Sequence, residues 1–190
     1  PGALSHQPPA RIGVDRYDTA ALVDLLTERV SAGVARNALD HEQVRRIADW
    51  ADGDAHDGLA AVFGAADRAD AAGHDHVRER DLDAGMADVP RPSVPLGRVV
   101  ALPARRQAVL RALVDLDEGQ RDAVAAASEA IAPAIDLSPS TVKRFLYELA
   151  EAGVVDRVPG PSRGGAGRPP SRLDPRFPTR VFRVLYDRAH

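Results

Sequence analysis

A cluster of prolines near the middle of the 190-residue chain divides it into two parts. Pro90, Pro92 and Pro95 follow one another closely, and Gly97 comes soon after. Prolines at this density neither continue a helix nor donate to a sheet. We therefore predict a tail or incoming linker over residues 1–10, one domain over 11–89, a proline-rich linker over 90–102, and a second domain over 103–190.

Charge is distributed unevenly between these parts, although the whole chain carries only −3. Residues 1–90 hold 9 Arg against 17 Asp or Glu, whereas residues 138–190 hold 10 basic against 5 acidic residues. A basic end beside an acidic front is typical of a chain whose C-terminal part meets phosphate. The absence of cysteine excludes disulfides and thiolate metal sites. No apolar run is long enough for a membrane span, so we expect a cytoplasmic protein without a membrane partner.

The first part shows four helical patterns. Apolar residues recur at intervals of three and four from Asp18 to Gly33, with Asp18 or Thr19 as the predicted N-cap. Asp40 with Gln43 forms a capping-box pattern before a second helix. A third helix is predicted over about 54–72 and a fourth over 80–89. The predicted buried residues are Ala55, Leu59, Val62, Phe63 and Ala66 in the third helix, and Leu82 and Met86 in the fourth. Between these helices, His74 and His76 lack further metal ligands and predict a solvated turn, so no metal is expected.

The most informative stretch of the second part begins at residue 137, after helices predicted from Pro103 onward and over 121–135. Ser138 can cap a helix, and Pro139 lies where its missing N–H costs nothing. Four apolar residues, Val142, Phe145, Leu146 and Leu149, fall on one face. The opposite face carries groups that can donate to phosphates and base edges in the major groove. Together with Ser138, the predicted DNA contacts on this recognition helix are Ser140, Thr141, Lys143, Arg144 and Tyr147.

A strand pair and a basic loop are predicted after the recognition helix. Residues 154–158 are predicted as one strand and 181–186 as its partner. The segment between them is rich in Gly and Pro, and its arginines can reach phosphates or the minor groove. These arginines are Arg163, Arg168, Arg172, Arg176 and Arg180, of which we take the first three as DNA contacts. The alternative is a loop whose arginines only keep it soluble.

This order of elements predicts a mainly α fold, in which a small helical domain precedes a winged helix-turn-helix domain with a β-hairpin wing. Duplex DNA is the expected partner. The sequence contains no Gly-rich phosphate loop with Lys-Ser/Thr, no nucleophile elbow and no paired catalytic signature. We therefore expect no enzymatic activity and no cofactor in this chain by itself.

Several short motifs of the first part resemble the AAA+ lid domain of archaeal replication initiators, the origin-recognition and cell-division-control family. They are residues 14–18 (VDRYD), 22–29 (LVDLLTER), 53–55 (GDA), 57–59 (DGL) and 65–69 (AADRA). In that family a winged helix follows the lid directly. The resemblance implies a role in DNA replication at origins. It also implies an ATPase core or other initiator subunits as partners, with ATP as a ligand only where such a core is present.

The sequence departs from that family in two ways. His56 stands where the family has an arginine that senses the nucleotide phosphate, and imidazole lacks the fixed fork of a guanidinium. We therefore expect no nucleotide sensing by His56. The ATPase core that precedes the lid is missing from this sequence, so we expect either a C-terminal piece of an initiator or a degenerate relative that binds DNA without a switch.

Two other functions fit the same residues. Residues 137–142 and 148–154 also resemble many winged-helix repressors, and the first part is then a dimerisation or effector domain. A stable dimer on a palindrome favours that transcriptional regulator. In the other alternative, the chain is a lid that docks onto a separate ATPase, the acidic first part binds protein, and the wing contributes little.

Overall fold

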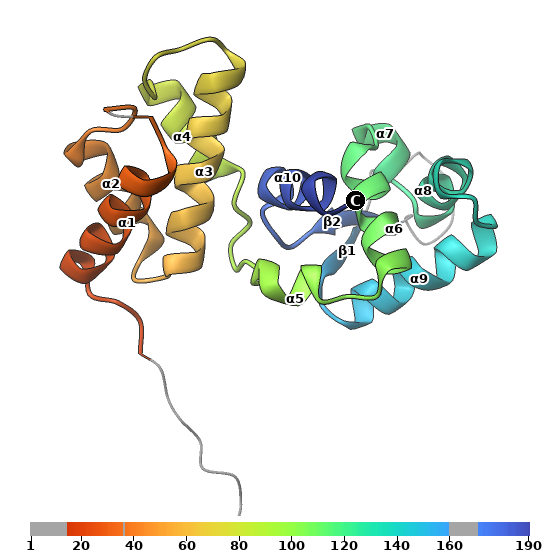
Figure 1. The fold of residues 1–190 in the computed structure, drawn as a ribbon. Coiled ribbons are helices and arrows are strands. Elements are labelled where there is room, and N and C mark those ends of the chain that lie inside the picture. The colour runs from red at the N-terminus through yellow and green to blue at the C-terminus, as the bar shows by residue number, and fades with distance from the viewer. Residues whose placement is uncertain (1–14, 36, 160–170) are drawn as a thin grey trace, which may run out of the picture.

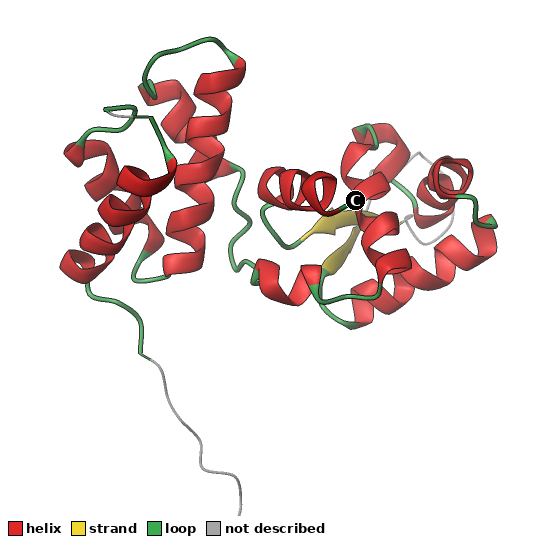
Figure 2. Cartoon of the chain, in the orientation of Figure 1, coloured by secondary structure: helices red, strands yellow, loops and turns green. Residues whose placement is uncertain are grey.

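The fold is given by a computed structural model that describes residues 15–35, 37–159 and 171–190 (Figure 1). Within these ranges the chain is mainly helical and contains one two-stranded antiparallel sheet (Figure 2). The predicted mainly α fold with a β-hairpin is therefore confirmed. No helix in the described ranges is long and apolar enough to cross a membrane.

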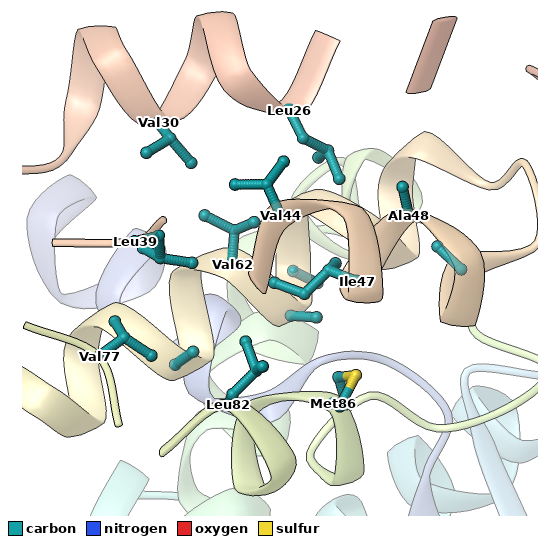
Figure 3. Packing of buried hydrophobic residues seen from close by; sticks show 14 of the residues in the cluster. Leu26, Val30, Leu39, Val44, Ile47, Ala48, Val62, Val77, Leu82 and Met86 are labelled. Carbon is teal, nitrogen blue, oxygen red and sulfur yellow. The ribbon is translucent and has the colours of Figure 1, made fainter. Parts of the chain in front are cut away.

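The first group of helices comprises α1 (Thr19–Gly33), α2 (His41–Ala51), α3 (Ala55–Ala71) and α4 (Glu79–Ala87), on the left of Figure 1. Predicted caps begin two of them. The Asp18 carboxylate accepts from the Ala21 N–H at 2.8 Å, and Asp40 with Gln43 forms a complete capping box. The apolar faces of all four helices meet in one core (Figure 3). Its members include Leu26, Val30, Val44, Ile47, Val62, Leu82 and Met86.

The predicted buried face of α3 is partly wrong. Leu59 is 37% exposed, whereas Ala61 and Ala65 are fully buried. The close approach of α3 and α4 explains this difference, because a Cβ added at Gly85 would lie 2.6 Å from the Ala65 nitrogen. Only small side chains fit where the two backbones cross, so Leu59 and the half-buried Phe63 lie outside that contact.

The predicted solvated turn at His74 is also wrong. The His74 side chain is 6% exposed, its Nδ1 lies 2.9 Å from Asp81 Oδ2, and its Nε2 lies 2.7 Å from Arg80 Nη2. Arginine can only donate, so Nε2 accepts and Nδ1 donates to Asp81. Burial opposes ionisation of Asp81, but the Arg78 N–H, His74 and Arg80 outweigh it and lower the pKa of this carboxyl. The pair therefore holds the start of α4.

The second group contains α6 (Ala104–Asp115), α7 (Glu118–Arg121), α8 (Val124–Ile131), the 3-10 helix η1 (Ala132–Ile135) and α9 (Pro139–Glu151). The strands β1 (Val155–Pro159) and β2 (Ser171–Pro175) and the helix α10 (Thr179–Ala189) follow. The helix predicted over 121–135 is thus split, and its last turn is 3-10 where Pro133 falls. Residues 90–102, predicted as a linker, include α5 (Leu96–Val100), and Val94 and Val99 are buried in the second core.

The partner of β1 differs from the prediction. β2 pairs with β1 so that Val155 lies opposite Pro175 and Pro159 opposite Ser171. Residues 181–186, predicted as the partner strand, lie in α10. Their β-branched and aromatic residues suggested a strand, but Phe182 and Tyr186 are one helical turn apart and their rings contact each other, with centroids 5.9 Å apart. Arg176 and Arg180 consequently lie beyond the hairpin and not in a wing.

Helix α10 contacts both groups. It packs against α5 and α6 of the second group and against α3 of the first (Figure 1). Val181 packs against the first core, and Arg180 forms an ion pair with Asp67 of α3. A separate contact is made by Arg91, which donates to the Trp50 carbonyl at 2.6 Å and lies over the indole ring. The acidic first group is thus joined to the second through side chains as well as through the chain.

Candidate nucleic-acid interface

Three hydroxyls gather at the start of α9. The Ser138 Oγ lies 3.0 Å from Ser140 Oγ and 2.9 Å from Thr141 Oγ1, and it accepts from the Thr141 N–H. Ser138 and Ser140 are exposed, and Thr141 is half-buried. The predicted cap therefore places three predicted DNA-contact residues together, at the end of the helix whose dipole favours anions.

Lys143 and Arg144 follow on the exposed face of α9, while Val142 and Leu146 are fully buried on the other. No carboxylate of the described ranges forms an ion pair with Lys143. The Arg144 side chain is 67% exposed and its Nε lies 4.0 Å from Glu148, at the limit of an ion pair. Both cations are therefore accessible to a phosphate.

Glu148, toward the far end of α9, is compensated from another helix. Arg106 of α6 donates to its carboxylate at 2.6 Å, and the same guanidinium lies 5.0 Å from the centroid of the Phe145 ring. This contact joins α6 to α9 and neutralises an acidic group that would otherwise oppose a nearby phosphate.

Tyr147 lies where α9 meets the hairpin. It is half-buried at the edge of the second core, and the Arg157 guanidinium of β1 lies 4.7 Å from its ring centroid. The Arg157 Nη2 also donates to Ser171 Oγ of β2 at 3.3 Å. Arg157 was not among the predicted DNA contacts, because residues 154–158 were predicted only as a strand. Its signal in the sequence was a cation in the strand that leads into the wing.

The wing arginines fall into different surroundings. Arg163 and Arg168 lie outside the residues that the structure describes. Arg172 lies on β2, and its Nε donates to the Asp174 carboxylate at 2.8 Å. This hydrogen bond, with the charge of Asp174, raises the pKa of the Arg172 guanidinium above its ordinary value. Arg172, predicted in the loop of the wing, therefore lies in a strand of the hairpin, and its charge is compensated by Asp174.

His56, at the start of α3, faces the second group. Its Nε2 accepts from the Leu96 N–H at 3.0 Å, and its Nδ1 lies 3.2 Å from the Asp57 carboxylate. A nitrogen that accepts carries no proton, so Nδ1 donates to Asp57. Asp54 lies close enough to complete a three-residue metal set, but its Oδ1 already accepts the N–H groups of His56 and Asp57 as the cap of α3. The set therefore serves the helix start and the junction with α5.

Part of the second group is similar to a known family of domains. Residues 101–171 match the family described as "Winged helix-turn-helix transcription repressor, HrcA DNA-binding". This segment runs from the turn before α6 to the first residue of β2. No curated protein matches the chain.

Several solved structures are similar to this chain over most of its length. The ORC1 protein of Aeropyrum pernix in complex with DNA has 22% identity and a TM-score of 0.41, covering 90% of this chain and 47% of that one. The ORC2 protein of Aeropyrum pernix has 18% identity and a TM-score of 0.39, covering 91% and 46%. Cdc6p from Pyrobaculum aerophilum has 18% identity and a TM-score of 0.38, covering 91% and 48%.

This chain spans about half the length of those archaeal structures. They belong to the group of proteins that the motifs of the first part resemble. Over residues 101–171 the chain is similar to a winged helix-turn-helix DNA-binding domain, and α6, α8, α9 and the β1–β2 hairpin stand in the order which that fold requires.

Proposed function

We propose that the chain binds duplex DNA, with α9 in the major groove and the hairpin against the neighbouring backbone. The observation that carries this proposal is the exposed set of hydroxyls and cations on α9, directly beside the hairpin. The family match of residues 101–171 supports it. Lys143 and Arg144 bind phosphates in this proposal, and Ser140, Thr141 and Tyr147 contact bases or sugars. Ser138 and the wing arginines Arg163, Arg168 and Arg172 add backbone contacts, Arg172 least because Asp174 compensates it.

The proposal is tested by titrating the chain into a fluorescent mixed-sequence duplex at several salt concentrations. Each phosphate contact contributes about 0.9 to the slope of log affinity against log salt on B-DNA. Replacing Lys143 and Arg144 by Ala is expected to reduce that slope by roughly 1.8. The matched control replaces Arg29 and Arg45, exposed cations of α1 and α2, which changes the net charge equally. Binding that does not depend on salt concentration contradicts the proposal, and so does an equal change of slope in the two double variants.

We further propose that the chain is the DNA-binding part of a replication-initiator-like protein whose ATPase core lies outside this sequence. The lid-like motifs of the first part support this role. Gly53 takes a left-handed φ of +77°, and its carbonyl accepts from the Tyr17 N–H at 3.1 Å, so two of the motifs meet at the turn between α2 and α3. This role predicts that one chain binds one duplex site. We expect light scattering of the chain with DNA to give a 1:1 complex.

A transcriptional repressor is the second candidate. It is favoured by the family match, which names a repressor. In that case α1–α4 form a dimerisation or effector domain, and a dimer occupies a palindrome whose half-sites are about 34–36 Å apart. A stable dimer in the same light-scattering measurement, without and with DNA, supports the repressor and contradicts the initiator-like role.

A further inference from the structure

We propose that Arg157 is a phosphate-binding residue that Tyr147 and Ser171 hold in place, so that the recognition helix and the hairpin contact DNA as one unit. This inference rests on the proposed DNA binding and deepens it, because it assigns the joint between the two elements a role in recognition.

The register of the hairpin sets the direction of the Arg157 side chain. Arg157 lies opposite Leu173 in the antiparallel pair, and directly opposed side chains point to the same face. Leu173 is fully buried in the second core, so this face of the hairpin is turned toward the core. Arg157 and Pro159, nearer the tip, are exposed. Arg157 therefore stands where the core-facing side of the hairpin emerges into solvent.

Among the residues that the structure describes, no carboxylate compensates the charge of Arg157. Arg172 pairs with Asp174, and Arg176 lies 3.5 Å from the Asp156 carboxylate. In the described ranges no carboxylate forms an ion pair with Arg157, and residues 1–14, 36 and 160–170 contain no Asp or Glu. Arg172 on the hairpin and Arg176 directly after it thus have carboxylate partners, whereas Arg157 keeps its charge for a phosphate.

The surroundings of Arg157 also restrict its motion. The guanidinium lies over the Tyr147 ring, and its Nη2 is bonded to Ser171. A guanidinium has five N–H donors, and the hydrogen bond to Ser171 uses one of them, so donors remain for a phosphate. A side chain that is ordered before binding loses less conformational freedom when it contacts a phosphate. Three elements, α9, β1 and β2, meet in this one arrangement.

A purely structural role for Arg157 makes a different prediction. In that case the aliphatic stem covers Tyr147 and the charge binds no phosphate, so removing the charge leaves the slope of log affinity against log salt unchanged. Arg157→Met keeps an unbranched apolar stem and removes the charge, whereas Arg157→Lys keeps the charge and removes the planar stack. Arg188→Met makes the same charge change on α10, which packs against α3, α5 and α6.

The test measures binding of the full chain to a fluorescent mixed-sequence duplex from 0.05 to 0.3 M salt, with thermal melting of each variant as a folding check. We expect Arg157→Met to reduce the log-log slope by about 0.9 and the affinity at 0.1 M salt roughly eightfold. We expect Arg157→Lys to keep the slope and lose part of the affinity, and Arg188→Met to keep the slope.

Tyr147→Leu provides a second measurement. If Tyr147 positions Arg157, the combined loss in Tyr147→Leu/Arg157→Met is smaller than the product of the two single losses. Equal slopes for Arg157→Met and the wild type overturn the inference, and so does a combined loss equal to the product. Failure of the wild type to bind duplex at 0.05 M salt overturns the proposed function itself, which distinguishes the two failures.

Discussion

Gly85→Ala tests whether the close crossing of α3 and α4 sets the architecture of the first group. A Cβ at residue 85 would lie 2.6 Å from the Ala65 nitrogen and 2.8 Å from the Ala61 carbonyl oxygen. Both atoms belong to the α3 backbone, so no side chain can rotate away to make room. The helices must separate, and Leu82 and Met86 of α4 then lose part of their packing against the first core.

The size of the effect follows from two opposing contributions. Replacing Gly by Ala within a helix favours folding by roughly 0.8–1.0 kcal/mol. Overpacking of a tight contact costs typically about 1–3 kcal/mol, and backbone atoms on the other side place this position at the upper end. We therefore expect a net loss of about 1–2 kcal/mol in the free energy of unfolding. Gly97→Ala in α5 is the control, because a Cβ there meets nothing within 4 Å.

Urea unfolding followed by circular dichroism measures this difference. The expected result is a lower midpoint for Gly85→Ala and an unchanged or higher midpoint for Gly97→Ala. DNA affinity of Gly85→Ala at temperatures below its unfolding should match that of the wild type, because the proposed contacts lie on α9 and the hairpin. A Gly85→Ala protein as stable as the wild type would refute the reasoning, since it would mean that the helices separate without loss.

Three further changes test particular contacts. The fold lowers the pKa of Asp81, so the ionised carboxylate stabilises the protein above the ordinary pKa of 3.8, and this stabilisation is lost as the pH falls through the lower folded value. In Asp81→Asn the melting temperature should therefore decrease less below pH 4 than in the wild type. Ser138→Ala removes the cap of α9 and should cost about 1 kcal/mol in urea unfolding, whereas Ser138→Asp, which restores an acceptor, should recover most of it. Arg180→Ala breaks the ion pair with Asp67 and should speed hydrogen exchange in α10 and α3 while lowering global stability by no more than about 1 kcal/mol.

Local chemistry made much of the fold predictable. Asp18, Asp40 and Ser138 each provide an acceptor about one turn before the buried apolar residues of a helix, and each caps the predicted helix. The buried face of α9 was also predictable, because Val142, Phe145, Leu146 and Leu149 recur at helical spacing. These features depend on neighbours in the sequence, which is why they needed no knowledge of the tertiary structure.

The missed features depend on residues far apart in the sequence. β2 has the sequence Ser-Arg-Leu-Asp-Pro, which carries little strand preference and pairs with β1 because the fold brings the two together. The small residues at Ala61 and Ala65 matter only because Gly85 of another helix crosses them. Arg157 likewise gains its surroundings from Tyr147, ten positions earlier, and from Ser171, across the hairpin. The pattern of apolar residues within one segment cannot predict such contacts between segments.

The junction between the two groups bears on how a salt series is interpreted. Salt weakens ion pairs that solvent reaches, such as the half-buried pair of Arg180 with Asp67, as well as contacts between protein and phosphate. The ion pair between Arg180 and Asp67 displaces no counterions from DNA. Breaking this ion pair therefore changes the affinity without removing a phosphate contact. Loss of a phosphate contact changes the slope of log affinity against log salt. Arg180→Ala should therefore shift the binding curves in parallel, while Lys143→Ala should change their slope. A changed slope for Arg180→Ala would place α10 in the DNA interface.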